Sequence, residues 1–180
     1  RYSQALREVI MQASKELGVE WLVNAQVEHI DAEGITLNDG QRIASKTVIW
    51  TVGVQANALT SQIPAPRDAQ GRLHVNHLLQ VEGYEDIYAT GDVAYAATDD
   101  KGNHALMTCQ HAIVLGKFAG NNAAARLLCV GPLPYRQENY VTCLELGAWG
   151  AVYTEGWDQQ VKLTRAEAKK LKLSITSELI

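Results

Sequence analysis

The sequence predicts an α/β fold that includes a small antiparallel meander, and three observations carry this prediction. Apolar residues recur at helical spacing near both ends and in the middle of the chain, with short strand-like runs between them. Glu33-Gly34 and Asp39-Gly40 are hairpin turn signals that separate three such runs. An apolar segment, residues 86–90, ends in Gly91-Asp92, which places a carboxylate at the edge of a sheet where open α/β folds bind ligands.

The first part of the chain predicts a helix, a strand, a meander and a second strand. Ser3 can cap the helix and Gly18 ends it, and its apolar face is formed by Leu6, Val9, Ile10, Ala13 and Leu17. The strands that follow are expected at residues 19–23, 26–31, 34–37, 41–43 and 46–51.

The remaining residues predict further strands and two more helices. Pro64, Pro66 and Gly71 mark residues 56–72 as an exposed connection. Strands are expected at 72–75 and 85–90, a long helix at 106–128, and a hairpin formed by residues 140–146 and 151–154. The capping box Thr164-Arg165-Ala166-Glu167 opens the last helix.

Composition excludes several function classes. The net charge of -4 over 180 residues argues against a dedicated nucleic-acid binder, which would show a basic face. No apolar run approaches the roughly 18 residues that a membrane-spanning helix needs. Three widely spaced cysteines suit free thiols in a reducing cytoplasm better than a disulfide framework or a zinc site. His74 and His77 lack further ligands, so no metal site is expected.

Gly91-Asp92 is the sharpest local signal for chemistry. Glycine allows a ligand to approach the backbone, and aspartate can accept hydrogen bonds from ligand hydroxyls. Taken alone, the pair is better explained by a turn with an Asx hydrogen bond.

The order of several segments resembles one known family. Four segments follow one another in the order found in the FAD-dependent pyridine nucleotide-disulfide oxidoreductases, which have two dinucleotide-binding domains. These segments are residues 48–53, residues 71–76, Gly91-Asp92 and residues 107–112. The resemblance implies that residues 1–51 end an NAD(P)H-binding domain, that 52–133 are the later part of an FAD-binding domain, and that 134–180 begin a C-terminal α+β domain. No G-x-G-x-x-G phosphate loop occurs, so both loops are expected to precede Arg1 in a longer chain.

The same resemblance implies roles for individual residues. FAD and NAD(P)H are the expected cofactors. Asp92 would hold the ribityl chain of FAD with Gly91 as its spacer, and Gly53 lies in the segment that returns to the FAD domain. The helix that begins near residue 108 would point its amino end at the flavin ring, which places Gln110, His111 and Ala112 beside the cofactor. For His111, a place on the surface or one layer behind the cofactor is favoured over direct contact.

Within the family, residues 109–114 are most similar to the type II NADH:quinone oxidoreductases. Gln110 and Ala112 match the Ala-Gln-x-Ala-x-Gln pattern of that group, whereas Cys109 and Val114 depart from it, which puts quinone binding in doubt. The expected activity is electron transfer from NAD(P)H through FAD to a quinone, with Gln110 near the flavin and the quinone.

Several alternatives stay open. The acceptor could be a disulfide, ferredoxin or sulfide, because a thiol such as Cys109 at a helix start can be reactive. The chain could also be a non-catalytic module that keeps the fold. In the quinone-reducing group, residues beyond this chain lie on the membrane, so a cytoplasmic protein with peripheral membrane contact is expected, and a homo-oligomer stays open.

Overall fold

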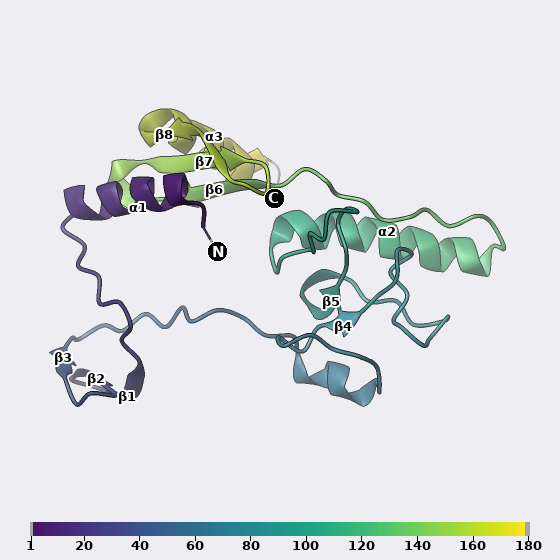
Figure 1. The fold of residues 1–180 in the computed structure, drawn as a ribbon, viewed down its shortest axis with the longest axis horizontal. Coiled ribbons are helices and arrows are strands. Elements are labelled where there is room, and N and C mark those ends of the chain that lie inside the picture. The colour runs from purple at the N-terminus through teal and green to yellow at the C-terminus, as the bar shows by residue number, and fades with distance from the viewer. Residues whose placement is uncertain (1, 179–180) are drawn as a thin grey trace. The chain divides into compact units, whose positions relative to one another are not determined.

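The computed structural model describes residues 2–178; Arg1, Leu179 and Ile180 lie outside them. The chain divides into two compact units (Figure 1), one formed by its first and last parts, up to Val52 and from Val141, and one by residues 53–140. Helices and mostly antiparallel strands alternate along the chain, so the predicted α/β class is confirmed at this level. None of the helices among the described residues has the length and apolar character needed to cross a membrane.

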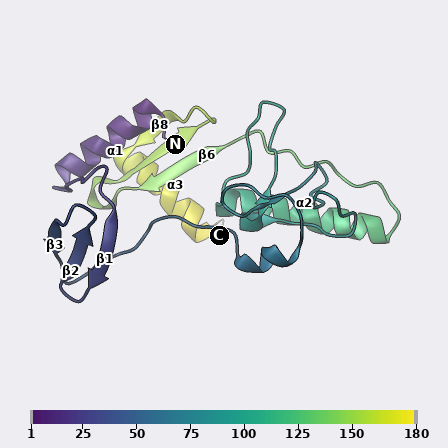
Figure 2. The same cartoon turned by 60° about the horizontal axis from the view of Figure 1, so that its bottom comes forward.

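The first unit is built around a three-stranded antiparallel sheet. Its strands are β6 (Val141–Glu145), β7 (Ala151–Glu155) and β8 (Gln160–Thr164), with the 3-10 helix η3 (Gly147–Trp149) between the first two. Two helices lie along this sheet (Figure 2), namely α1 (Gln4–Glu16) and α3 (Arg165–Glu178). The predicted hairpin and both predicted helices are confirmed, whereas β8 was not predicted.

The predicted meander is confirmed. It consists of β1 (Val27–Asp31), β2 (Gly34–Leu37) and β3 (Arg42–Ala44), paired in that order. Asp31 and Arg42 form an ion pair at 2.7 Å between the outer strands. The guanidinium of Arg42 and the backbone of Glu33 lower the pKa of Asp31 to about 2.

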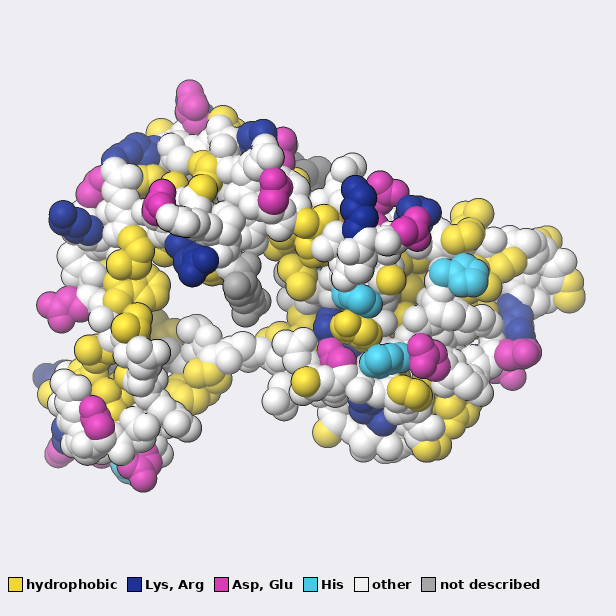
Figure 3. Space-filling model, viewed as in Figure 1, with side chains coloured by type: hydrophobic (Ala, Val, Ile, Leu, Met, Phe, Trp, Pro, Cys, Tyr) yellow, Lys and Arg dark blue, Asp and Glu magenta, His cyan; other side chains and the backbone are white. Residues whose placement is uncertain are grey.

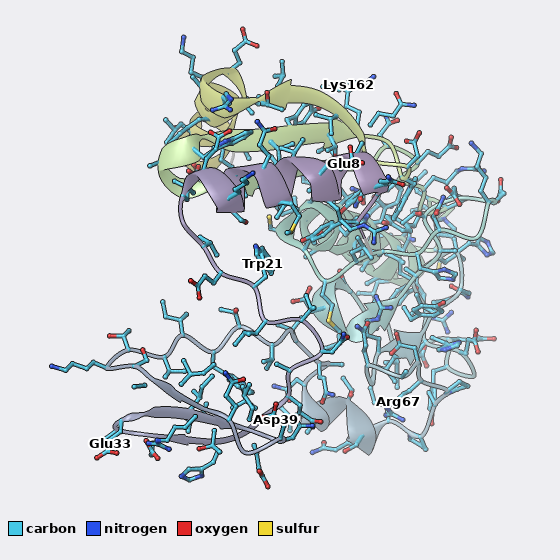
Figure 4. All side chains as sticks on the ribbon, turned by 60° about the vertical axis from the view of Figure 1, so that its left-hand side comes forward. Glu8, Trp21, Glu33, Asp39, Arg67 and Lys162 are labelled. Atoms are coloured by element: carbon cyan, nitrogen blue, oxygen red, sulfur yellow. The ribbon has the colours of Figure 1, made fainter. Side chains whose placement is uncertain are left out.

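The strands predicted at residues 19–23 and 46–51 are wrong. Both segments are open chain, and their apolar side chains are largely exposed, with Ile49 at 81%. Figure 4 shows Trp21 on the open stretch that follows α1, and hydrophobic side chains stand at the surface among charged ones (Figure 3). A strand forms only beside a hydrogen-bonding neighbour, and residues 2–178 supply none for either segment.

The second unit packs one long helix against irregular chain and a short parallel ladder. Its elements are η1 (Ala58–Gln62), β4 (Leu73–His74), η2 (Gly91–Val93), β5 (Ala94–Tyr95) and α2 (Cys109–Leu127). β4 and β5 are parallel. The predicted helix and the predicted strand at 72–75 are both confirmed, each shorter than expected. The core beneath α2 contains Leu79, Ala96, Ala105, Leu115, Ala119 and Tyr135.

The strand predicted at residues 85–90 is wrong in extent. Tyr88 forms a single β-bridge with Gln80, and two further backbone bonds join Ile87 and Ala89 to the same neighbouring segment. The chain turns at residues 82–84, so the two segments run side by side over too few residues for a regular ladder. Gly91-Asp92 therefore opens the turn η2 that leads into β5, and does not end a regular strand.

Candidate functional site

The Gly91-Asp92 turn packs on the amino-terminal part of α2. A Cβ atom built on Gly91 would lie 3.8 Å from the Cβ of Ala112, and one built on Gly116 would lie 3.9 Å from the hydroxyl of Thr90. Gly91 has a φ of 64°, in the left-handed region that glycine adopts without strain. The sequence therefore places glycine where the turn needs a left-handed backbone, and the helix lies at ordinary van der Waals distance from it.

Asp92 is exposed beside this contact. Within residues 2–178, its carboxylate makes no hydrogen bond or ion pair with another side chain. An ionised carboxylate accepts hydrogen bonds through both oxygens. Asp92 is thus available to accept hydrogen bonds from the hydroxyls of a bound molecule.

The first turn of α2 is held by its own cap. Thr108 precedes the helix, and its hydroxyl accepts a hydrogen bond from the backbone N–H of His111. The carbonyl of Thr108 accepts from the N–H groups of His111 and Ala112, at 3.1 Å and 2.9 Å. The free N–H groups at a helix amino end carry partial positive charge, which favours a negatively charged group nearby.

His111 lies inside the unit and does not line its surface. Its side chain is fully buried, with the imidazole Nδ1 2.9 Å from the Thr108 hydroxyl and the ring centroid 5.7 Å from that of Tyr140. Burial lowers the pKa of His111, which favours the neutral ring near pH 7. The His111 side chain therefore contacts the first turn of α2 on its buried side.

The other predicted site residues differ in their exposure and in their neighbours. Gln110 is half-buried on the first turn of α2, and Cys109 before it is exposed. Gly53 has a φ of 102°, and nothing lies within 4 Å of a Cβ atom built on it. The structure thus brings Gly91 and Asp92 beside the turn that carries Gln110, His111 and Ala112.

Sequence reasoning missed Gln137, whose side chain contacts the first turn of α2, and Tyr135, which donates a hydrogen bond to Gln137. The side-chain amide of Gln137 donates to the carbonyl of Gln110 at 3.2 Å. It also accepts from the Tyr135 hydroxyl at 2.9 Å. No sequence signal could have found them, since they follow α2 by many residues in a segment without regular structure.

A small cavity lies elsewhere in the same unit. It measures about 110 Å³ and is lined by Val75, Asn76, His77, Ala97, Asp99, Asp100, Tyr135 and Arg136. Ligand pockets usually measure roughly 300–1,000 Å³, so this cavity is too small for a dinucleotide. Among the described residues, no group of three or more histidines, cysteines or carboxylates could hold a metal ion.

The residues around Asp92 fit part of a flavin site. The uncommitted carboxylate suits a ribityl hydroxyl, the glycine beside it leaves the backbone accessible, and the amino end of α2 suits a ring that gains negative charge on reduction. A seat for the pyrophosphate, which needs a glycine-rich turn at a helix start, is not found among residues 2–178.

Comparisons with known proteins find relatives among NADH-dependent oxidoreductases. An NADH dehydrogenase-like protein of Mycobacterium tuberculosis is 42% identical over 97% of this chain, which spans 43% of that relative's length. The type II NADH:quinone oxidoreductase of the same organism is 34% identical over 44% of this chain and 19% of its own. A water-forming NADH oxidase from Lactobacillus brevis, solved with NADH, has the same fold, with a TM-score of 0.66 at 19% identity over 94% of this chain and 36% of its own.

The family match covers most of the chain and confirms the expected resemblance. The pyridine nucleotide-disulphide oxidoreductase family matches residues 1–116. Its members use FAD and NAD(P)H, the two cofactors that the sequence predicted. The chain belongs to the pyridine nucleotide-disulphide oxidoreductases, a family of NAD(P)H-dependent flavin oxidoreductases.

Proposed function

We propose that the whole protein is an oxidoreductase that oxidises NAD(P)H and reduces a quinone, with FAD carrying the electrons between them. The family supports the two cofactors, and the names of the NADH dehydrogenase-like and NADH:quinone oxidoreductase relatives support the donor and the acceptor. In this proposal, residues 1–51 end the NAD(P)H domain, residues 52–133 are the later part of the FAD domain, and residues 134–180 begin a C-terminal domain.

One observation carries the proposal. The carboxylate of Asp92 is exposed, bonds to no other side chain within residues 2–178, and lies beside the amino end of a long helix. Asp92 accepts hydrogen bonds from the ribityl hydroxyls, and Gly91 leaves room for the ligand to approach the backbone. The first turn of α2 supplies N–H groups and positive potential on the side of the ring, where Gln110 also stands. These residues bind and orient, while the chemistry comes from the cofactor.

The flavin assignment is tested by Asp92→Asn in the whole protein. The variant keeps the shape of the side chain and removes a charge-assisted acceptor, which is worth roughly 1.5–3 kcal/mol. The dissociation constant for FAD, measured by flavin fluorescence, should rise about tenfold or more. Asp86→Asn is the matched control, because Asp86 is an exposed partner of Arg126 on the preceding segment. Equal FAD affinity in a folded Asp92→Asn variant would contradict the assignment.

The acceptor is tested separately by Gln110→Ala. If Gln110 stands at the quinone, stopped-flow absorbance should show slower reoxidation by quinone, while bleaching of the flavin by NADH stays nearly unchanged. Cys109→Ser serves as the second arm, since Cys109 is exposed at the start of the same helix. Loss of turnover with sulfide or a disulfide in Cys109→Ser, without an effect of Gln110→Ala on quinone, would replace the quinone by a thiol-dependent acceptor.

A further inference from the structure

The side chain of Gln137 connects two parts of the second unit through its amide. Its Oε1 accepts a hydrogen bond from the Tyr135 hydroxyl at 2.9 Å. Its Nε2 donates to the backbone carbonyl of Gln110 at 3.2 Å. Because one end of the amide accepts and the other donates, both bonds together fix its orientation.

Tyr135 is a rigid support for this amide. Only 4% of the residue is exposed, and its ring packs edge-on against Phe118 of α2, with centroids 5.6 Å apart. Its backbone N–H donates to the carbonyl of His77 at 2.8 Å. Burial raises the pKa of Tyr135 to about 12, so the hydroxyl stays protonated and remains a donor at any physiological pH.

The backbone of Gln137 is fixed as well. Its N–H donates to the carbonyl of Thr98 at 2.9 Å, and Thr98 is fully buried. Residues 135–137 are thus held at both ends by bonds to two different segments. The Gln137 side chain reaches α2 from a support that cannot shift freely.

The carbonyl of Gln110 receives this bond in the first turn of α2. In a regular helix such a carbonyl already accepts the N–H of the fourth residue onward. The hydrogen bond from Gln137 is an additional one, and its donor lies outside the helix. Two residues further along, Ala112 faces Gly91, so any displacement of this turn also changes its distance to Asp92.

We propose that Gln137 is a positioning residue, which, held by Tyr135, keeps the first turn of α2 in the place from which it faces the flavin. The part of this inference that concerns the flavin rests on the proposed function. The hydrogen bonds from Tyr135 to Gln137 and from Gln137 to Gln110, called the brace below, are a property of this chain. Gln137 does not touch the cofactor in this proposal; it acts through Gln110.

The brace is tested by hydrogen exchange of the backbone amides of residues 111–114 in the whole protein without added cofactor. Gln137→Met removes both hydrogen bonds at nearly constant length, and Gln137→Glu keeps the acceptor for Tyr135 but loses the donor to Gln110. Both variants should exchange about fivefold faster at these amides, the size expected for one net hydrogen bond. Asn139→Ala, which removes an exposed amide from the same segment, should leave these rates unchanged.

Tyr135→Phe provides a second, conservative variant that keeps the packed ring. It should reproduce part of the effect, and combining it with Gln137→Met should add little, because both act on one chain of bonds. The flavin part is read from the ratio of the affinities for oxidised and reduced FAD, which sets the midpoint potential. Loosening the positive helix end should weaken binding of the reduced form more, lowering the potential in Gln137→Met and not in Asn139→Ala.

Each outcome decides one part. Unchanged exchange at residues 111–114 overturns the brace. Faster exchange along the whole of α2, including residues 119–127, also overturns it, since that marks a general loss of stability. Faster exchange confined to the first turn, with an unchanged potential, overturns the link to flavin. If the wild-type protein binds no FAD, the proposed function is refuted. The brace is then tested by hydrogen exchange alone, because that measurement needs no cofactor.

Discussion

At the scale of single residues, Asn122 is a buried polar group that joins α2 to two other segments of the second unit. It is fully buried on α2, and its Nδ2 donates to the carbonyls of Leu78 and Leu133 at 3.0 Å and 2.9 Å. Its Oδ1 accepts from the N–H of Leu133 at 2.8 Å. One side chain thus satisfies three backbone groups of two segments that have no regular secondary structure.

Asn122→Ala should therefore lower the free energy of unfolding by about 2–4 kcal/mol, because it removes a fully buried amide and leaves three partly buried backbone groups without this partner. Urea unfolding followed by circular dichroism measures the change. Asn121→Ala is the neighbouring control; its exposed side chain makes a single bond, to Asn122, and the substitution should cost less than about 0.5 kcal/mol. Equal losses in the two variants would show that the buried bonds contribute little.

The buried His111 gives stability a dependence on pH. Burial lowers its pKa in the folded chain, whereas the unfolded chain keeps the ordinary value of about 6.5. The unfolded state therefore binds more protons between the two values, so stability is complete above the unfolded pKa and falls as pH drops towards the folded one.

His111→Gln removes this titration and should flatten the dependence. The quantity to measure is the difference in unfolding free energy between pH 8 and pH 5, in the wild type and in the variant. The wild type should lose more stability on acidification than the variant. A larger loss in the variant would mean that His111 gains a proton more easily when folded.

At the scale of elements, two glycines predict opposite effects of the same substitution. Gly150 precedes β7 with a φ of 120°, and a Cβ atom built there would lie 2.5 Å from the backbone of Arg165, at the start of α3. Gly120 lies inside α2, exposed, with nothing within 4 Å of such an atom. Alanine is therefore strained and crowded at the first position and unobstructed at the second.

Gly150→Ala should destabilise the chain by about 2–4 kcal/mol, through the strained φ and the displaced backbone. Gly120→Ala should stabilise it by roughly 0.5–1 kcal/mol, because alanine favours the helix. Thermal unfolding of both variants beside the wild type gives the two shifts. A Gly150→Ala variant as stable as the wild type would refute the crowding at Gly150, and a destabilised Gly120→Ala variant would contradict the open space at Gly120.

The elements also show what the sequence could predict. Caps and turns are local, so the helix that starts at Ser3 and the meander around Gly34 and Gly40 were predicted close to their observed bounds. Strand pairing is not local. The apolar runs at 19–23 and 46–51 have strand character but no neighbour, while β8, with its mixed polar residues, forms because β7 lies beside it.

The candidate site divides in the same way. Gly91, Asp92 and the turn with Gln110 could be selected from the sequence, because the order of several segments resembles a known family. The contact between Gly91 and Ala112 and the bond from Gln137 to Gln110 could not, since both depend on how distant segments pack. Family resemblance selects the candidate residues, and packing determines which contacts hold them.

At the scale of the whole molecule, the chain spans 43% of the length of the NADH dehydrogenase-like relative from Mycobacterium tuberculosis, and in the proposed function it supplies one side of a flavin site. Dinucleotide affinity in these folds depends on a pyrophosphate seated at a glycine-rich turn and a helix amino end. No G-x-G-x-x-G sequence occurs in the 180 residues. One carboxylate and one helix end must then offset the entropy lost by immobilising a large ligand.

We therefore expect the 180-residue chain by itself to be colourless and to bind FAD only weakly, if at all. Titration with FAD, followed by flavin fluorescence at micromolar concentrations, should show no saturation, whereas the whole protein should bind one FAD for each chain. Asp92→Asn distinguishes the two cases further, because it should weaken binding in the whole protein and change nothing in the chain alone. Stoichiometric binding by the chain would mean that the described residues already supply a pyrophosphate seat, in conflict with the proposed division of the flavin site.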